Sequence, residues 1–369
     1  MDELLGVSII VLNYNYGRFL TAAIDSALNQ DHPLCEVIVV DDGSTDNSRA
    51  VIGRYGDRIQ SVLRATNDGQ ISALSSTWPL AHHPIVIFLD ADDVLFPHAA
   101  ATVARHWTPG TVKMQSPLVT IDKEGRQVGH VAPKYPPNLD TATIRAEIIR
   151  TGGSPNSPGS GNAYARSLLA RISADGGFDL ENPRDYHMDA VLECNAPFYG
   201  EVMTLYEPLS CYRIHNNNIF AINNIKNAHF AMKCRTFELK VEYLAGRCKV
   251  WGIPFDPAAV CNSSVWLLEC RLAEAKIAEE QKAEPIFTTL CRAITACIGA
   301  QLPLVYRVLR IVWLVSIATA PRALAIRLIA LRFVSSQRPA WFEPVLIKLL
   351  RISTRSHRVM QIGPTRYGS

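Results

Sequence analysis

The 369-residue sequence lacks the cysteine pattern of a disulfide-bonded or zinc-binding protein. Its nine cysteines are scattered, their number is odd, and no two form a CxxC pair. We therefore expect a protein of a reducing compartment, the cytosol. The chain begins MDELLG and runs directly into the apolar segment VSIIVL, without a basic start or a small-residue cleavage site. This pattern predicts that it carries no signal peptide.

Several common nucleotide and metal motifs are absent as well. The sequence contains no GxxxxGK[ST], no HExxH, and no GxGxxG after its first apolar segment. This argues against P-loop NTPases, zinc peptidases and dehydrogenases. The acidic segment DDGSTD, residues 41–46, is not an EF-hand loop, because position 12 would be Ile52 or Gly53 instead of glutamate.

Acidic residues are almost missing from the C-terminal region. Residues 285–369 contain 12 Lys and Arg against one acid, Glu343, whereas the remainder holds 25 Lys and Arg against 33 acids. A basic, apolar region on an acidic body predicts two environments for one chain.

A long apolar run is also missing from this region. Its longest uncharged stretch, residues 293–306, has 14 residues, whereas a membrane span needs about 20. The arginine spacing predicts amphipathic helices that lie on an anionic membrane surface. A helical bundle packed on the catalytic domain or on a second subunit is the alternative. Nucleic-acid binding is disfavoured, because the face opposite the arginines is apolar.

The first hundred residues alternate between strand and helix patterns. The remainder is expected to be loops and short strands over residues 108–160, a strand pair over 203–214 and helices over 226–283. Residues 151–161, rich in Gly, Ser and Pro, form a long loop of the kind that is often functional. The chain should therefore be an α/β protein, with a mostly parallel sheet covered by helices on both faces. The expected strands are 7–12, 37–40, 59–63 and 85–89, and the helices 18–29, 46–55 and 71–80.

Polar clusters follow three of these strands. Ligands of such sheets bind beyond the carboxyl ends of the strands, so residues 13–15, 41–42 and 90–93 should meet at one edge. Asp90 and Asp92 can face one Mg²⁺ or Mn²⁺ and leave its other positions for phosphate oxygens. A solvated turn is the alternative. Asp93 has no assigned role, and we expect it to begin the next helix.

At this point the sequence resembles a known family. The segments VSIIVLNYN, EVIVVDDGSTD and FLDADD, in this order, resemble glycosyltransferase family 2 with the GT-A fold. Downstream, GGFD (176–179), RDY (184–186) and YRIH (212–215) are similar to the family's GGFD, (E/D)D-Y and YRxH elements. The resemblance covers about residues 6–216. The chain lacks QxxRW, which suggests a non-processive enzyme.

The resemblance implies roles for single residues. Arg184 departs from the family, which has an acid before the base. The implied metal ligand is Asp92, holding Mg²⁺ or Mn²⁺, and the implied base is Asp185, or Asp189 if the register slips. The implied nucleotide-sugar contacts are Asn13 and Tyr14 at the nucleobase, Asp42 at base or ribose, Asn67 near the nucleotide, Asp90 at ribose or metal, and His215 at the diphosphate, where a structural histidine is the alternative.

The implied activity is inverting, metal-dependent transfer from a nucleotide-diphosphate sugar, expected to be UDP-linked. The acceptor would be a glycan or lipid-linked hydroxyl in surface polysaccharide or glycolipid synthesis, at the inner face of the plasma membrane. The rivals are a sugar-nucleotide pyrophosphorylase and a catalytically inactive GT-A protein that assists membrane assembly. The expected regions are 1–225 (catalytic, with a nucleotide-sugar half 1–110 and an acceptor half 111–225), 226–284 (helical) and 285–369 (basic, membrane-associating).

Overall fold

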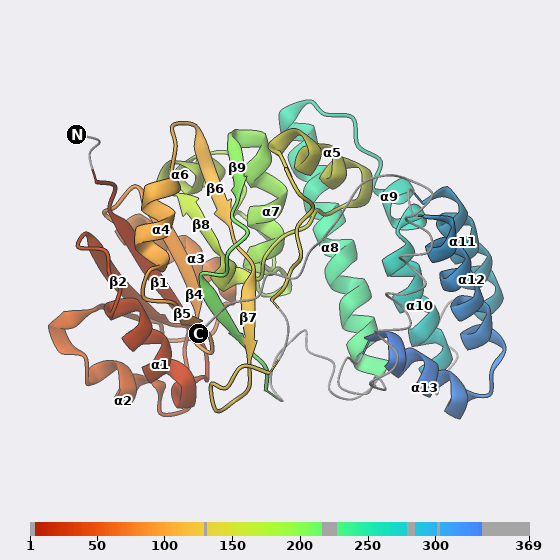
Figure 1. The fold of residues 1–369 in the computed structure, drawn as a ribbon, viewed down its shortest axis with the longest axis horizontal. Coiled ribbons are helices and arrows are strands. Elements are labelled where there is room, and N and C mark those ends of the chain that lie inside the picture. The colour runs from red at the N-terminus through yellow and green to blue at the C-terminus, as the bar shows by residue number, and fades with distance from the viewer. Residues whose placement is uncertain (1–3, 129–130, 216–226, 279–284, 301–302, 334–369) are drawn as a thin grey trace, which may run out of the picture. The chain divides into compact units, whose positions relative to one another are not determined.

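The computed structural model describes residues 4–128, 131–215, 227–278, 285–300 and 303–333 (Figure 1). The chain divides into two compact units, one of residues 1–221 with 238–257 and one of residues 222–237 with 258–369. Helix α8, Asn227–Trp251, contributes to both units. The expected region boundaries, at residues 225 and 284, stay predictions.

The first unit is built on a seven-stranded sheet with the order β3-β2-β1-β4-β8-β6-β9. Strand β1 is parallel to β2 and β4, and β2 is parallel to β3. Strand β8 is antiparallel to both neighbours, while β6 and β9 are parallel. The predicted α/β class with a mostly parallel sheet is confirmed. The strands are β1 Val7–Asn13, β2 Cys35–Asp41, β3 Gln60–Leu63, β4 Ile85–Asp90, β6 Thr111–Gln115, β8 Asn162–Ala165 and β9 Glu201–Thr204.

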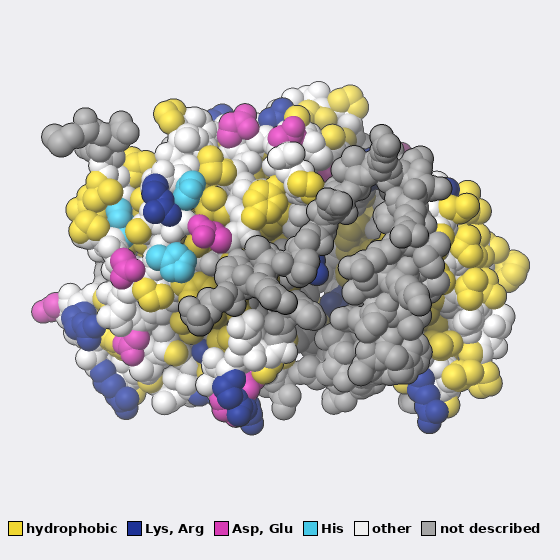
Figure 2. Space-filling view, in the orientation of Figure 1, with side chains coloured by type: hydrophobic (Ala, Val, Ile, Leu, Met, Phe, Trp, Pro, Cys, Tyr) yellow, Lys and Arg dark blue, Asp and Glu magenta, His cyan; other side chains and the backbone are white. Residues whose placement is uncertain are grey.

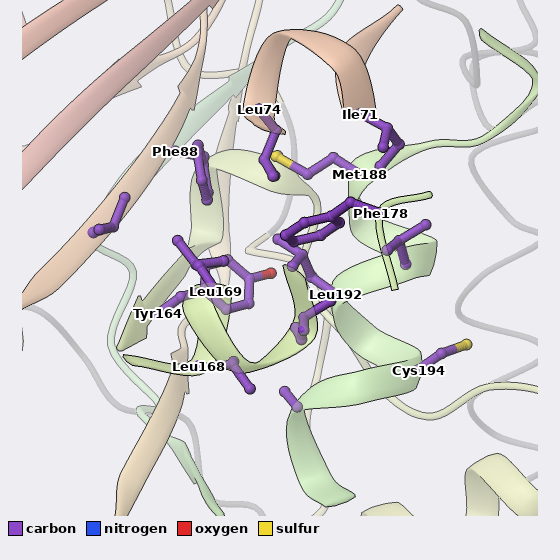
Figure 3. Close-up of a cluster of buried hydrophobic side chains, with 14 of the residues drawn as sticks. Ile71, Leu74, Phe88, Tyr164, Leu168, Leu169, Phe178, Met188, Leu192 and Cys194 are labelled. Atoms are coloured by element: carbon purple, nitrogen blue, oxygen red, sulfur yellow. The ribbon is translucent and has the colours of Figure 1, made fainter. Parts of the chain in front are cut away.

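Helices cover both faces of this sheet. Successive residues of a strand point to opposite faces, so Ile9 packs with α1 and α4 while Ile10 packs with α3, α6 and α7. Figure 3 shows the second of these cores, where Phe88 and Tyr164 of the sheet meet Leu74, Leu169 and Met188. The helices are α1 Gly17–Leu28, α2 Ser48–Gly53, α3 Gln70–Thr77, α4 Ala99–His106, α6 Arg166–Ala174 and α7 Met188–Tyr199.

One helix contradicts the expectation for its segment. Residues 108–160 were expected to be loops and short strands, but α5, Thr141–Thr151, lies within them. Its N-cap Asp140 accepts the N–H of Thr143 at 2.7 Å, and it ends at Gly152 in the left-handed region (φ 77°). It has only three buried residues, so its apolar stripe was too short to stand out among the surrounding Pro, Gly and Ser.

A second, three-stranded sheet corrects two further expectations. It has the order β5-β10-β7, with strands Val94–Leu95, Ser210–Arg213 and Leu118–Ile121. The expected pairing within residues 203–214 is wrong, because β9 joins the large sheet and β10 the small one. Asp93 does not begin a helix, because β5 follows it and its carboxylate accepts the N–H of Arg213 at 2.9 Å.

The second unit is helical. Its helices are α9 Pro257–Ser263, α10 Val265–Ile277, α11 Ile286–Gly299, α12 Leu304–Thr319 and α13 Arg322–Phe333. Helices α10 to α13 share one core, which includes Leu268, Cys297 and Leu314. Two of its arginines face a fully buried carboxylate, since Arg310 and Arg332 lie 3.6 and 3.2 Å from Glu269. Among the helices of the described residues, none has the length and hydropathy of a membrane-spanning segment.

Candidate active site

The carboxyl ends of β1, β2 and β4 meet at one edge of the large sheet. Strand register pairs Asn13 with Asp41, and Leu12 with Asp90. The Asn13 side chain is buried and donates to Asp41 Oδ1 at 2.7 Å and to Ser44 Oγ at 3.1 Å. Tyr14, the next residue, is 42% exposed. Asn13 therefore holds the loop after β2 by hydrogen bonds, whereas the Tyr14 side chain is accessible from solvent.

Asp42 organises the loop of residues 67–70. Its carboxylate accepts the N–H groups of Asp68 at 3.3 Å and Gly69 at 2.9 Å, and Arg64 Nη1 lies 3.0 Å from it. Burial raises the pKa of Asp42, although the two N–H groups and Arg64 oppose this. Asn67 Oδ1 accepts the N–H of Gly69 at 2.9 Å. Two predicted nucleotide contacts, Asp42 and Asn67, thus belong to one small assembly.

The acidic cluster after β4 consists of Asp90, Asp92 and Asp93, of which Asp92 and Asp93 are buried and Asp90 is partly buried. The pKa values of Asp90 and Asp93 are raised well above the ordinary range, first by burial and then by the charges of neighbouring aspartates. Hydrogen bonds from the Arg213 N–H and from the Ser160 side chain oppose this shift at Asp93. A cation would relieve this repulsion, so the donor set fits a hard divalent ion.

A metal ion at this cluster would take only part of its ligands from the protein. Within the described residues, no group of three His, Cys, Asp or Glu is arranged as a complete cage. An ion held by one or two carboxylates together with phosphate oxygens would need no such group.

His215 joins the acidic cluster. Its Nε2 lies 2.9 Å from Asp92 Oδ2, and its ring lies 5.5 Å from the Tyr16 ring and 4.9 Å from that of Phe19, between centroids. The neighbouring Arg213 donates from Nε to the Asp92 carbonyl at 2.7 Å. Sequence reasoning missed Tyr16, although it lies in the same NYNYG segment as Asn13. Burial and the charges of Asp92 and Asp90 raise its pKa.

The two candidate bases occupy different surroundings. Asp185 lies in the short 3₁₀ turn η4, Pro183–Asp185, and is exposed. Asp189 lies in the first turn of α7, and its Oδ2 accepts the N–H of Gly159 at 3.1 Å. Its Oδ1 is buried without a hydrogen-bond partner among the described residues. Burial raises the pKa of Asp189 to about 6.

The loop rich in Gly, Ser and Pro, residues 152–161, which we call the Gly-Ser loop, passes between Asp90 and Asp189 at Gly159. A Cβ atom on Gly159 would lie 2.7 Å from Asp90 Oδ2 and 3.4 Å from Asp189 Oδ1. Ser160 Oγ accepts the N–H of Asp90 at 3.0 Å. The loop thus fixes the end of β4, and only a residue without a side chain fits between the two carboxylates.

A buried lysine beneath this loop was also missed. The Lys113 ammonium donates to Asn156 Oδ1 and, at 3.3 Å, to Gln115 Oε1. Burial lowers its pKa to about 8. A lysine inside the otherwise uncharged strand TVKMQ was the signal in the sequence.

Comparisons with known proteins find similar glycosyltransferase sequences. The sequence model described as Glycosyl transferase family 2 matches residues 8–172. An uncharacterised glycosyltransferase of Nostoc sp. is 36% identical over 221 residues, which is 58% of this chain and 66% of that protein. WfgD of Escherichia coli, a UDP-Glc:α-D-GlcNAc-diphosphoundecaprenol β-1,3-glucosyltransferase, is 35% identical over 95 residues, 26% of this chain and 37% of that protein. The matches thus span less than two thirds of either relative.

Solved structures show a similar fold. Staphylococcus aureus TarS 1–349 in complex with UDP-GlcNAc aligns with a TM-score of 0.53 and 17% identity, over 89% of this chain and 91% of that one. The mannosyltransferase PcManGT from Pyrobaculum calidifontis, in complex with GDP-Man and Mn²⁺, aligns with a TM-score of 0.50 and 16% identity, over 95% and 88%. At these identities the likeness concerns the fold alone.

Proposed function

Because residues 8–172 belong to glycosyl transferase family 2 and the fold around them is GT-A, we propose that this chain transfers a sugar from a nucleotide-diphosphate sugar to an acceptor hydroxyl. One observation carries the proposal. Asp90, which lies in the acidic cluster with the proposed metal ligand Asp92, and Asp189, a candidate base, both border Gly159. A metal-binding carboxylate and a proton acceptor around one space are what such a transfer needs.

The donor in this proposal is UDP-linked. TarS was solved with UDP-GlcNAc, and the name of WfgD gives UDP-Glc as its donor. The nucleotide would lie over the exposed Tyr14 ring, beside Asn13 and the loop of residues 67–70. Asp42 would use its remaining lone pairs to accept a hydrogen bond from the base or the ribose.

Asp92 would hold the divalent cation, Mg²⁺ or Mn²⁺, with Asp90 and His215 beside it. PcManGT was solved with Mn²⁺ on the same fold. When bound, such an ion neutralises the charge on the departing diphosphate. His215 keeps Asp92 oriented, and in the closed complex it would contact the diphosphate.

A carboxylate must accept the proton of the acceptor hydroxyl. The acceptor oxygen bonds to the anomeric carbon, the bond from that carbon to the diphosphate oxygen breaks, and the diphosphate leaves with the electron pair. A direct displacement of this kind inverts the anomeric centre. Asp185 is the base by family position and Asp189 the alternative. Asp189, with a pKa raised to about 6, is mostly ionised at neutral pH and can accept a proton there.

The proposed acceptor belongs to surface polysaccharide or glycolipid synthesis, and we propose that the second unit binds an anionic membrane surface. Helix α12 exposes Leu304, Val308, Val312 and Val315 at helical spacing, and hydrophobic side chains gather over α11 and α12 in Figure 2. No acid occurs in α11 to α13, while arginines do. An apolar stripe with basic neighbours is typical of interfacial helices.

Co-sedimentation with anionic liposomes tests the membrane proposal. A chain truncated before residue 285 would expose the core face of α10, including Leu268, so point variants are cleaner. Val308→Ser with Val312→Ser should reduce binding, whereas Thr295→Ser on the exposed face of α11 should not. Equal binding by both variants would contradict the proposal.

Thermal-shift screening tests the donor and metal sites. UDP-, GDP-, dTDP- and CMP-linked sugars are added with Mn²⁺ to the wild type and to Asp92→Ala. We expect a metal-dependent shift with a nucleotide-diphosphate sugar, and its loss in Asp92→Ala. An unchanged shift in the variant would remove Asp92 from the site.

A further inference from the structure

Arg184 joins the turn that carries Asp185 to the loop of residues 67–70. It lies in η4, and its Nη2 donates to the carbonyl oxygen of Asn67 and lies 3.3 Å from Asp68 Oδ1. The backbones also approach closely, because a Cβ atom on Gly69 would lie 2.8 Å from Arg184 Cα. One guanidinium thus holds both a main-chain and a side-chain oxygen of this loop.

The contact continues to the end of β2. Asp68 Oδ2 lies 3.0 Å from Arg64 Nη2, and Arg64 Nη1 lies 3.0 Å from Asp42 Oδ1. Arg64 also donates to Ser72 Oγ at 2.7 Å. Four side chains of alternating charge therefore run from Asp42, a predicted nucleotide contact, to the turn of the candidate base Asp185. We call this series the clasp: Asp42, Arg64, Asp68 and Arg184.

We propose that Arg184 is a positioning residue. It docks the turn Pro183–Asp185 onto the loop of residues 67–70, and so couples the order of this loop to the placement of Asp185 in the turn and of Asp189 after it. The family pattern has an acid at this position. An acid here would face Asp68, and the like charges would repel each other. The basic residue is therefore matched to Asp68, and Arg184 need not signal a lost active site.

We expect the clasp to hold the loop of residues 67–70 in one arrangement and to add little to the free energy of unfolding. The Arg184 and Asp68 side chains are 64% and 44% exposed, and exposed ion pairs add little to folding. What the pair can do is to select one arrangement of a short loop. Loop opening is measurable at the N–H groups that donate to Asp42, those of Asp68 and Gly69.

Hydrogen exchange on the full-length, ligand-free protein tests the clasp. In Arg184→Ala the amides of Asp68 and Gly69 should exchange about fivefold faster, and Arg184→Lys should lie between, because an ammonium cannot hold both oxygens in the same fork. The matched control is Arg150→Ala, which removes an exposed arginine paired with Glu147 on α5. Asp68→Asn combined with Arg184→Ala should exchange no faster than the faster single variant.

The functional readout rests on the proposed function. With UDP and Mn²⁺, Arg184→Ala should raise the Kd about fivefold, and with a donor and acceptor it should lower kcat as well as raise KM. A change in donor KM alone would mean a local contact and would overturn the coupling. Equal exchange in Arg184→Ala and Arg150→Ala would overturn the clasp, whether or not the wild type binds UDP. Absence of UDP binding by the wild type would instead contradict the proposed function.

Discussion

Among single residues, Gly159 is critical because it separates the side chains of Asp90 and Asp189. Any Cβ there would lie 2.7 Å from Asp90 Oδ2, closer than such atoms approach. We expect Gly159→Ala to displace a carboxylate or the loop, to destabilise the fold by about 1–3 kcal/mol, and to lower kcat at least tenfold. Thermal unfolding and initial rates check this. Gly246→Ala in helix α8, with open space around it, should keep wild-type activity.

The raised pKa of Asp189 predicts a pH-dependent stability. Folding raises this pKa to about 6, so between about pH 4 and 6 the folded state binds the proton more tightly than the unfolded state. The tighter proton binding by Asp189 therefore stabilises the folded state at acid pH, and this stabilisation is lost as pH rises through 6. Without divalent ions, Asp189→Asn should gain about 1 kcal/mol relative to the wild type between pH 5 and pH 7.5. Denaturant titration at the two pH values measures this.

The control for this titration is Asp185→Asn, which changes an exposed side chain. Its stability should follow the wild-type pH profile. A gain in Asp185→Asn equal to that in Asp189→Asn would contradict the assignment of the pH dependence to Asp189.

The sequence was enough to predict which residues meet at the strand ends, but not which residues meet through packing of the Gly-Ser loop. Parallel strands end at a common edge, so the order of strands along the chain was enough to bring Asn13, Asp42 and Asp90 together. Asp189 and Gly159 meet only because α7 and the Gly-Ser loop pack against each other. That contact depends on tertiary packing, and therefore the choice between Asp185 and Asp189 could not be made from spacing.

Among the structural elements, the loop of residues 67–70 depends on Gly69 for its backbone conformation. Gly69 has φ +88°, and a Cβ would meet Arg184 Cα at 2.8 Å. Gly69→Ala should therefore weaken UDP binding at least tenfold, since both backbone conformation and contact oppose the new atom. Gly110→Ala is a matched control, with φ +89° and open space around it. Calorimetric titration with UDP and Mn²⁺ measures the difference, and equal affinity of the two variants would contradict this account.

The strands whose partners were predicted wrongly have weak local patterns. Strands β9 and β10 have four residues each and follow one another closely, so pairing between them looked natural. They part because β9 adds to β6 while β10 lies between β5 and β7. Long apolar strands such as β1 and β4 carry their own signal, whereas short strands take their partners from the surrounding sheet.

The whole molecule has two units, and the second depends on a buried acid. Glu269 is fully buried and lies within 3.6 Å of Arg310 and within 3.2 Å of Arg332. Glu269→Gln should leave both guanidinium groups without their counter-charge, and destabilise this unit by about 2 kcal/mol. Calorimetry should show a lower transition for the second unit and unchanged UDP binding. An unchanged transition would contradict the role of Glu269.

In the basic region, the number of charges along the chain did not predict which arginines are paired within the fold. Its arginines were expected at a lipid surface, but Arg310 and Arg332 lie against Glu269, an acid of another helix. Charge counts could not reveal this pairing, because it depends on how α10, α12 and α13 pack. The expectations for residues 334–369 lie outside the described residues.

Nucleoside diphosphate release is the most direct test of the central claim. Full-length protein is incubated with UDP- and GDP-linked sugars, Mn²⁺ and a panel of hydroxyl acceptors, beside Asp92→Ala of equal thermal stability. We predict release above the blank with at least one donor, and a loss of at least about a hundredfold in the variant. Release no greater than the blank for every donor, from folded protein, would contradict the proposed transferase and favour a non-catalytic role.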